Sequence, residues 1–470
     1  MAASNDHHID FQSLIKFIYK EKHYFEGIRI LEQHHSNDPT NRQIIASLFD
    51  LYFQCGFTDQ YLSLFNKVSQ LFKKSPFIYL FYLQIQPFLS DITIQTITKT
   101  RCDFAKTFLP PVKKQIVTHT AKPILNIGYY GDLVHLMNLP TVLNGHDLNR
   151  VKATVYTADQ RLSHYWSGCI RDTSALSPQE IIQQIQYDQI DVLIYMEEAI
   201  QIYRKDWAVL SAKPAPIQLF WVNQYATSGT DYFDYIVADP YTITELEYPY
   251  YTEKPLFLPQ WLSYEFPQYI HPIKPLPALQ NGYITFGSSN RIVKLNARVI
   301  QTWAQILKQV PNSRLILKDR VFSDEASEAY LRKQWAQLGF PIDRLITKPF
   351  TKHPEYYEFF NDIDIALDPF PFTGNITTME TVMMGVPLIS MSGRIFFENY
   401  SKSWLSVIGL SDFVATTEGE YISKAAGLAS DQSKLIEFRD SIRKKIQTSG
   451  VLDGAQFARE LEAQLFHIIR

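Results

Sequence analysis

Cysteine is scarce in this chain of 470 residues. The three cysteines, Cys55, Cys102 and Cys169, lie far apart and lack the close spacing of metal ligands. Small secreted domains that depend on disulfides carry many more cysteines, and zinc sites place theirs in short pairs. The composition therefore excludes a disulfide scaffold and favours a reducing compartment, and we expect a cytoplasmic protein.

The sequence also lacks a large excess of charge of either sign and any long apolar run. The 45 Lys and Arg residues nearly balance the 48 Asp and Glu residues, which argues against nucleic acid or a bulk membrane surface as partner. The longest apolar tract, Phe77–Leu89, is too short for a transmembrane segment and is interrupted by Gln84, Gln86 and Pro87. No basic segment followed by an apolar one opens the sequence, so we expect no secretion signal.

The N-terminal region, 1–112, has the pattern of amphipathic helices and contains a weak internal repeat. At one constant offset, Tyr19 matches Tyr52 and Leu31 matches Leu64, and a helix-stopping Pro follows each copy, at Pro39 and Pro76. Tetratricopeptide repeats have a similar period, about 34 residues, although their usual small residues are mostly absent here. Two interpretations stay open: a surface that holds a protein or peptide, or a helical cap packed on an enzyme core.

From Pro123 onward, strands alternate with helices, which predicts two doubly wound α/β halves. We place the first half at residues 118–268, a Pro-rich linker at Pro259–Pro277, and the second half at residues 272–470. Two consecutive halves of this kind form a cleft between them. The expected strands are Ile124–Tyr129, Val151–Tyr156, Ile190–Met196, Pro216–Val222, Tyr235–Ala238, Tyr283–Phe286, Arg314–Lys318 and Arg344–Thr347, and the expected helices are Pro178–Tyr187, Asn296–Val310, Asp324–Leu338 and His353–Phe360.

The stretch Asp364–Met391 predicts a strand, a polar loop, a short helix and a second buried strand. Gly374 and Asn375 form the turn, Thr377 or Thr378 can cap the helix, and Glu380 follows one turn later. Hydroxyls at a helix start with a carboxylate beyond them suit a diphosphate followed by a ribose. An ordinary capped helix between two strands explains the same residues.

Five collinear motifs resemble the O-linked N-acetylglucosamine transferases, over about Pro123–Leu461. The family also includes Spindly-type O-fucosyltransferases and, more distantly, bacterial adhesin N-glucosyltransferases. The motifs are Pro214–Gln218 with Trp221, Thr227–Gly229 and Asp234–Ile236; Phe286–Lys294; Trp303–Ser313; the stretch Asp364–Met391; and Asp453–Leu461.

The resemblance implies a GT-B fold and an inverting transfer of a sugar from a nucleotide to a protein side chain, without a metal or other cofactor. Lys294 corresponds to the lysine that holds the donor diphosphate, where a cation offsets the charge of the leaving group; a surface lysine at a helix start is the plain alternative. Asp362 and Asp364 open a strand at the end away from the nucleotide loop, so we expect no metal site there.

The donor site implied by the resemblance extends beyond Lys294. Thr377 and Thr378 match the diphosphate loop, and Glu380 matches the carboxylate on the ribose. Asn375 and Ile376 depart from the commoner His and Thr. The remaining candidate donor residues are Asn290, Arg291, Gly374, Thr351, His353 and Tyr356, the last of which is expected to stack on the base.

The acceptor side resembles the family less closely. His135 is the candidate catalytic base, with a surface histidine as the alternative, and Asp191 stands where the animal enzymes have a histidine. Glu198, Ala199 and Ile200, preceded by Glu197, take the place of the usual Gly-His-Thr; the two carboxylates are candidate bases, or solvated or structural groups. Thr227, Ser228 and Gly229 complete the predicted acceptor side.

The sequence thus predicts a protein glycosyltransferase that uses a UDP-sugar, with N-acetylglucosamine first and glucose second, on Ser or Thr. The resemblance leaves open transfer to Asn in bacterial adhesins. A third possibility, from another class, is a binding scaffold that kept the nucleotide cleft but lost transfer.

Overall fold

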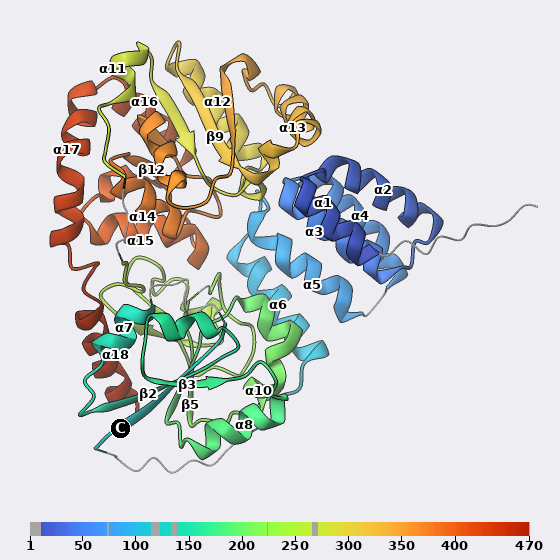
Figure 1. Ribbon diagram of the computed structural model, residues 1–470, viewed down its shortest axis with the longest axis vertical. Helices are drawn as coiled ribbons and strands as arrows, with labels where there is room; N and C mark the ends of the chain where they lie inside the picture. The colour runs from blue at the N-terminus through green and yellow to red at the C-terminus, as the bar shows by residue number, and fades with distance from the viewer. Residues whose placement is uncertain are drawn as a thin grey trace, which may run out of the picture.

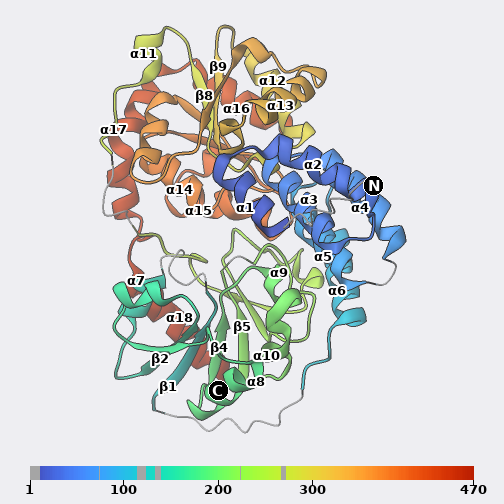
Figure 2. The same cartoon turned by 45° about the vertical axis from the view of Figure 1, so that its right-hand side comes forward.

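Two α/β lobes and a block of helices make up the protein, as a computed structural model shows (Figure 1). The structure describes residues 11–72, 75–113, 123–132, 139–222, 224–265 and 271–469. In Figure 1 the second half lies above the first, and the N-terminal helices lie to one side of both. The 45° turn of Figure 2 brings these helices in front of the junction between the lobes.

The first half is built on a seven-stranded parallel sheet with the order β3-β2-β1-β4-β5-β6-β7. The sequence missed β3 and β7, which are short and only partly buried strands at the two edges. The strands are β1 (Leu125–Tyr130), β2 (Val151–Thr157), β3 (Cys169–Asp172), β4 (Val192–Tyr195), β5 (Ile217–Phe220), β6 (Tyr235–Ala238) and β7 (Lys254–Phe257). The helices are α7 (Leu139–Gly145), α8 (Pro178–Tyr187), α9 (Ala199–Gln201) and α10 (Trp207–Ser211), with a π-helical turn, η3 (Ile202–Asp206), between the last two.

The second half contains a six-stranded parallel sheet with the order β10-β9-β8-β11-β12-β13. The sequence missed the short edge strand β13, and the helix expected at His353–Phe360 is present as a 3-10 helix, Glu355–Asp362, which begins two residues later. The strands are β8 (Thr285–Ser288), β9 (Arg314–Asp319), β10 (Leu345–Pro349), β11 (Ile365–Leu367), β12 (Leu388–Met391) and β13 (Val414–Ala415). The helices are α11 (Pro277–Asn281), α12 (Ala297–Gln309), α13 (Glu325–Gln337), α14 (Ile376–Met383), α15 (Tyr400–Val407), α16 (Glu418–Ala429) and α17 (Gln432–Thr448).

The helices of the described N-terminal region pack on one another in chain order. Tyr19 and Tyr52 of the weak repeat lie on α1 and α3, and Leu31 and Leu64 lie on α2 and α4, so the repeat relates one helix pair to the next. Pro76 does not stop a helix as expected; it occupies the first turn of α5, where its missing N–H costs nothing. The bounds are α1 (Phe11–Glu21), α2 (Tyr24–Asn37), α3 (Arg42–Cys55), α4 (Thr58–Leu71), α5 (Pro76–Ile85) and α6 (Ile94–Phe108).

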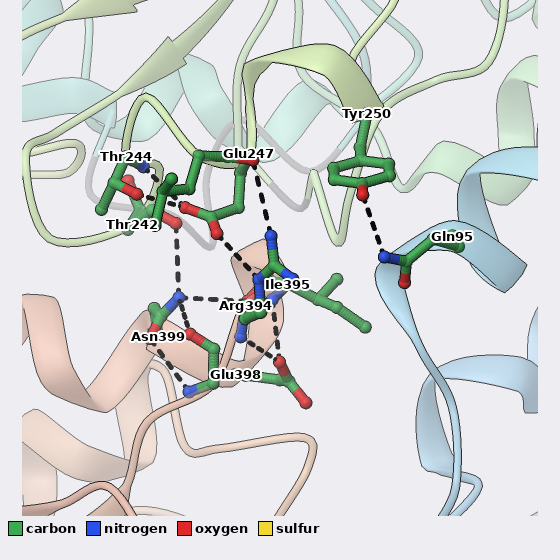
Figure 3. Close-up of polar contacts among 11 residues, drawn as sticks. Gln95, Thr242, Thr244, Glu247, Tyr250, Arg394, Ile395, Glu398 and Asn399 are labelled. Atoms are coloured by element: carbon green, nitrogen blue, oxygen red, sulfur yellow. Dashed lines mark hydrogen bonds and ion pairs between the residues drawn. The ribbon is translucent and has the colours of Figure 1, made fainter.

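The seam between the two halves is aromatic in its centre. Trp261 is fully buried and stacks on Tyr400 of α15, with ring centroids 5.1 Å apart. The expected linker at Pro259–Pro277 is therefore not a plain linker, since its first described residues are core residues. Polar contacts border the seam, where Arg394 pairs with Glu247 across the halves at 3.1 Å and Tyr250 accepts from Gln95 of α6 (Figure 3).

The last helix, α18 (Gly454–Ile469), crosses back and packs on α7 of the first half (Figure 1). The two helices meet at glycines, since a Cβ on Gly145 would overlap Ala455 and a Cβ on Gly454 would overlap Thr141. The sequence division placed this helix with the second half, but the structure packs it against the first. Among the described residues, none of the helices has the length and apolar character needed to cross a bilayer.

Candidate functional site: a nucleotide pocket on the second half

The carboxyl ends of β8, β9 and β11 lie side by side in the second sheet, and the candidate donor residues follow them. Asn290 to Lys294 come after β8, and Asp368 to Asn375 come after β11, just before α14 begins at Ile376. Ligands of open parallel sheets bind at this edge, where helix N-termini present unpaired N–H groups. The strand order therefore brings together two motifs that lie far apart in the sequence.

Lys294 is the central cation of this edge. Its Nζ donates to Asn290 Oδ1 at 2.9 Å and to the Thr373 carbonyl at 2.8 Å, and it lies 4.6 Å above the Phe372 ring. The side chain is buried, and desolvation lowers the pKa of Lys294 to about 7, with Asp368 opposing the shift. The alternative of a surface lysine does not fit this burial. A diphosphate beside Nζ would restore the charged form.

The loop before α14 is held by buried side chains. Asp368 Oδ1 accepts from the Gly374 N–H at 2.8 Å, and a Cβ on Gly374 would overlap Thr378 Oγ1. Thr378 is fully buried and its hydroxyl bonds Ser401 at 2.7 Å, so it faces the interior. The predicted threonine cap was wrong: α14 begins at Ile376 with Asn375 at its cap position and no side-chain cap bond.

Asn375 has its own partner, because its Oδ1 accepts from Trp404 Nε1 at 3.0 Å. This bond holds the Asn375 side chain against α15. The backbone N–H groups at the start of α14 and the half-buried Thr377 are candidate phosphate donors of the loop.

Glu380 and Tyr356 line a cavity of about 430 Å³ at this edge, together with Thr377 and His353. The Glu380 carboxylate is buried, and desolvation raises its pKa to about 7 while the hydroxyls of Tyr356 and Tyr357 oppose the shift. The Tyr356 hydroxyl also bonds Ser289 Oγ at 2.9 Å. The cavity therefore combines an aromatic wall with a carboxylate, which suits a base and a ribose.

Thr351 and His353 lie on the segment before the 3-10 helix. Thr351 Oγ1 is buried and has no hydrogen-bond partner among the described residues, and Thr351 is not one of the residues that line this cavity. His353 is more than half exposed, with Nε2 3.8 Å from Glu380 Oε1, and desolvation lowers its pKa. Both positions are compatible with the predicted base-binding segment.

The sequence missed several residues of the cavity wall. Phe53 and Gln54 reach it from α3, and the Arg291 guanidinium lies 4.9 Å over the Phe53 ring. Lys318 and Arg320 reach it from the end of β9. The position of β9 beside β8 in a doubly wound sheet was a usable signal for the last two. Nothing in the local sequence of α3 pointed to the cavity.

On the first half, Glu198 is the predicted acceptor residue that reaches a cavity next to the nucleotide pocket. This second cavity, of about 220 Å³, is also lined by Arg101, Tyr225 and Arg291. It shares Arg291, Phe53 and Gln54 with the nucleotide pocket, so the two cavities adjoin.

The structure places the other acceptor candidates elsewhere. Asp191 precedes β4, at the amino end of the sheet, and its Oδ2 accepts from the Asn126 N–H at 2.9 Å. Thr227 and Ser228 are fully buried, and both donate to Glu253, from Oγ1 at 2.8 Å and from the backbone N–H at 2.7 Å. Gly229, with φ of +68°, lies against the α6 backbone at Arg101. His135 lies outside the described residues.

Glu197 faces a separate cavity at the carboxyl edge of the first sheet, lined also by Asp132, Lys205 and Asp206. Its Oε1 accepts from the Asp132 N–H at 2.6 Å, and desolvation raises its pKa to about 7. Within the described ranges, no cluster of three or more His, Cys, Asp or Glu side chains has the geometry to hold a metal ion.

Comparison with known proteins matches residues 172–265 and 274–461 to the family described as Glycosyl transferase family 41. A probable UDP-N-acetylglucosamine–peptide N-acetylglucosaminyltransferase SPINDLY of Hordeum vulgare is 33% identical over 333 residues, which are 68% of this chain and 35% of that protein. A protein of the same name from Arabidopsis thaliana is 31% identical, again over 68% of this chain. The chain thus corresponds to about a third of the length of these curated relatives.

Among solved structures, a mutant of the Thermobaculum terrenum O-GlcNAc transferase superposes with a TM-score of 0.88. The match covers 97% of this chain and 89% of that chain at 23% sequence identity. The arrangement of helical block and two lobes is therefore a shared fold, and it confirms the predicted GT-B architecture.

Proposed function

Because the chain belongs to glycosyl transferase family 41, we propose that it moves a hexose from a nucleotide sugar to a protein side chain. The observation that carries the proposal is the buried Lys294 beside the start of α14, with Glu380 and Tyr356 in the adjoining cavity. A pure scaffold has no need of a buried cation at a helix N-terminus. On this proposal residues 272–470 supply the donor site and residues 118–268 the acceptor side.

The proposed transfer step uses no metal ion. An acceptor hydroxyl attacks the anomeric carbon from the face opposite the diphosphate, so the new C–O bond forms with inversion as the bond to phosphate breaks. The nucleoside diphosphate leaves with the electron pair of that bond, and a base takes the hydroxyl proton. Lys294 and the N–H groups of α14 offset the negative charge that develops on the leaving group.

For the base we assign Glu198, since it is a carboxylate of the first half in the cavity next to the nucleotide pocket. Its place there is supported by Arg291, which lines both cavities. Glu197 is held by the Asp132 backbone and faces the other cavity, so we do not assign it to this step.

The donor we infer is a UDP-sugar, with N-acetylglucosamine before glucose, and the acceptor is Ser or Thr. The printed names of the SPINDLY relatives support N-acetylglucosamine and a peptide acceptor. A ribose carboxylate such as Glu380 fits UDP and GDP equally, and transfer to Asn differs only in the acceptor. We also infer a cytoplasmic location, which the three free cysteines support.

Incubation with labelled UDP-N-acetylglucosamine, UDP-glucose or GDP-fucose and a host lysate tests the proposal. Label should appear on protein with the wild type and with Lys308→Ala, an exposed lysine of α12, and should disappear with Lys294→Ala. Mass spectrometry of the product then identifies the sugar and the atom that carries it, which decides between Ser/Thr and Asn.

Donor binding without any labelled protein would instead favour the scaffold. In that case calorimetry should show that Lys294→Ala weakens the nucleotide sugar although no transfer occurs. Absence of both binding and transfer would overturn the proposal altogether.

A further inference from the structure

The cavity beside the nucleotide pocket has walls from all three parts of the molecule, and we call it the arginine pocket. The helical block supplies Phe53, Gln54, Leu83, Gln84, Phe88 and Arg101. The first half supplies Glu198, Ile200, Tyr203 and Tyr225, and the second half supplies Arg291. More than half of the lining therefore comes from a region that the sequence treated as a cap or an acceptor surface.

A single aromatic ring, that of Phe372, lies between the arginine pocket and Lys294. Phe372 carries the Lys294 ammonium 4.6 Å above its ring. The same ring stacks on Phe88 at 4.9 Å and meets Tyr225 edge-on at 5.0 Å, and both of these line the arginine pocket. The Phe372 ring thus separates Lys294 from the arginine pocket, and this pocket adjoins the nucleotide pocket through the shared wall of Phe53, Gln54 and Arg291.

Arg101 is the unusual member of the lining. It comes from α6, its side chain is 2% exposed, and Nη1 donates to the Thr227 carbonyl at 2.7 Å. Nε is buried and has no hydrogen-bond partner among the described residues. Buried arginine donors are nearly always paired, so an unpaired one that lines a cavity calls for an acceptor from a ligand or water.

The other side chains that line the pocket indicate which kind of ligand it would bind. Hydroxyl groups accept from arginine and donate to carboxylate, and Arg101 with Glu198 offers both. Phe53, Phe88 and Tyr225 supply apolar faces that suit the C–H face of a hexose. Two arginines against one carboxylate leave donors in excess, which suits a ligand rich in hydroxyl and carbonyl oxygens.

We propose that the arginine pocket holds the hexose of the donor and that Arg101 of the helical block is one of its direct ligands. This rests on the proposed function, because it presupposes a nucleotide sugar at Lys294. The helical block then belongs to the donor site, rather than serving only to recruit acceptors, and it takes part in choosing the sugar.

Calorimetry with two probes tests the proposal: UDP-N-acetylglucosamine, which has the hexose, and UDP, which lacks it. Arg101→Met should weaken UDP-N-acetylglucosamine about tenfold or more, since a hydrogen bond to a charged group is lost, and should leave the Kd of UDP within about twofold. Arg29→Met is the matched control, because this exposed arginine of the same helical block pairs with Glu26 on its own helix and does not line the pocket.

Arg101 also holds the Thr227 carbonyl, so a second variant guards against misfolding. Gln84→Leu removes a half-buried amide that lines the arginine pocket but not the nucleotide pocket, and it should show the same sugar-specific loss at smaller size. If wild-type protein binds UDP-glucose or GDP-fucose instead, the comparison is made with that donor and its free nucleotide.

Three results would overturn the inference while leaving the proposed function in place. One is an equal loss for the donor and its free nucleotide in both variants, and another is an unchanged donor Kd in both. The third is an unchanged donor Kd with a raised acceptor KM, which would assign the pocket to the acceptor. Failure of the wild type to bind any nucleotide sugar would overturn the proposed function itself.

Discussion

The two halves share one topology and differ in how their candidate residues are used. On the second half, Lys294, Gly374 and Glu380 lie at one sheet edge, and Glu380 lines a cavity there together with Arg291 and Thr377 of the same motifs. On the first half, Thr227 and Ser228 are tied to Glu253 in the interior, facing α6. The motif Thr227–Gly229 of the first half therefore holds the helical block in place. The motifs of the second half instead contribute residues to a cavity wall.

This difference shows that a motif shared with a family can mark a tightly constrained backbone instead of a ligand contact. Gly229 is needed because its φ is +68° and the α6 backbone lies against it. A buried loop that must satisfy its polar groups is constrained as strictly as a phosphate loop. The predictions below test whether the two kinds of constraint separate by experiment.

The largest effect is expected from Glu253→Ala on the first half. The change leaves the buried Ser228 N–H and Thr227 hydroxyl without an acceptor, which should cost about 3 kcal/mol of unfolding free energy. Because the carboxylate serves the fold, the Kd of UDP should stay within about twofold. Thermal melting and calorimetry measure the two quantities, with the exposed Glu245→Ala as control.

An unchanged melting temperature together with a lost transfer activity would contradict this assignment. It would mean that Thr227 to Gly229 belong to the acceptor site, as the sequence suggested, and that the contrast between the halves is false.

The second prediction concerns Gly374→Ala in the loop before α14. The new Cβ would overlap the buried Thr378 hydroxyl and crowd Asp368, so the loop must shift at the phosphate position. We expect the Kd of UDP to rise at least tenfold while the melting temperature changes little. Gly419→Ala, at a helical position with open space around it, should leave the Kd unchanged and stabilise slightly. Equal Kd values for the two variants would remove Gly374 from the donor site.

The sequence predicted those parts of the fold that have a local signal and missed those that depend on long-range packing. The central strands of both sheets were predicted closely because alternation and buried runs are local signals, whereas the short edge strands β3, β7 and β13 escaped. The candidate donor residues were predicted from the family resemblance, because the local sequence of the loop before α14 suits an ordinary capped helix equally well, and their role stays a prediction. The arginine pocket escaped, because Arg101 and Gln54 reach it through packing of α3 and α6 on the lobes, which no local pattern encodes.

The third prediction uses pH to separate Lys294 from Glu380, whose pKa values both lie at about 7 without ligand. A bound diphosphate raises the pKa of Lys294, so the contribution of Lys294 to UDP affinity is complete below pH 7 and is lost at higher pH, where affinity falls by up to about tenfold per unit. The ribose needs the Glu380 carboxylate, so affinity also falls below pH 7. Calorimetry across pH 5.5 to 9 should therefore show a maximum near about pH 7.

Two variants test which side chain causes the fall in UDP affinity on the acid side and on the alkaline side of the profile. Lys294→Met should lower affinity and flatten the alkaline limb, and Glu380→Gln should flatten the acid limb alone. A profile that keeps both limbs in both variants would show that other groups titrate, and that the burial of these two side chains is structural, as on the first half.

The smallest effect is expected where the halves meet, at the ion pair of Arg394 with Glu247 (Figure 3). Arg394 is 54% exposed, so water competes for its guanidinium, whereas Trp261 and Tyr400 stack in the buried centre of the same seam. The coupling energy from a double-mutant cycle of Arg394→Gln and Glu247→Gln should stay below about 1 kcal/mol and fall with added salt. Glu253→Ala, by contrast, removes contacts that water cannot replace. A coupling energy well above the range of exposed ion pairs would mean that this polar border, rather than the aromatic centre, holds the two halves together.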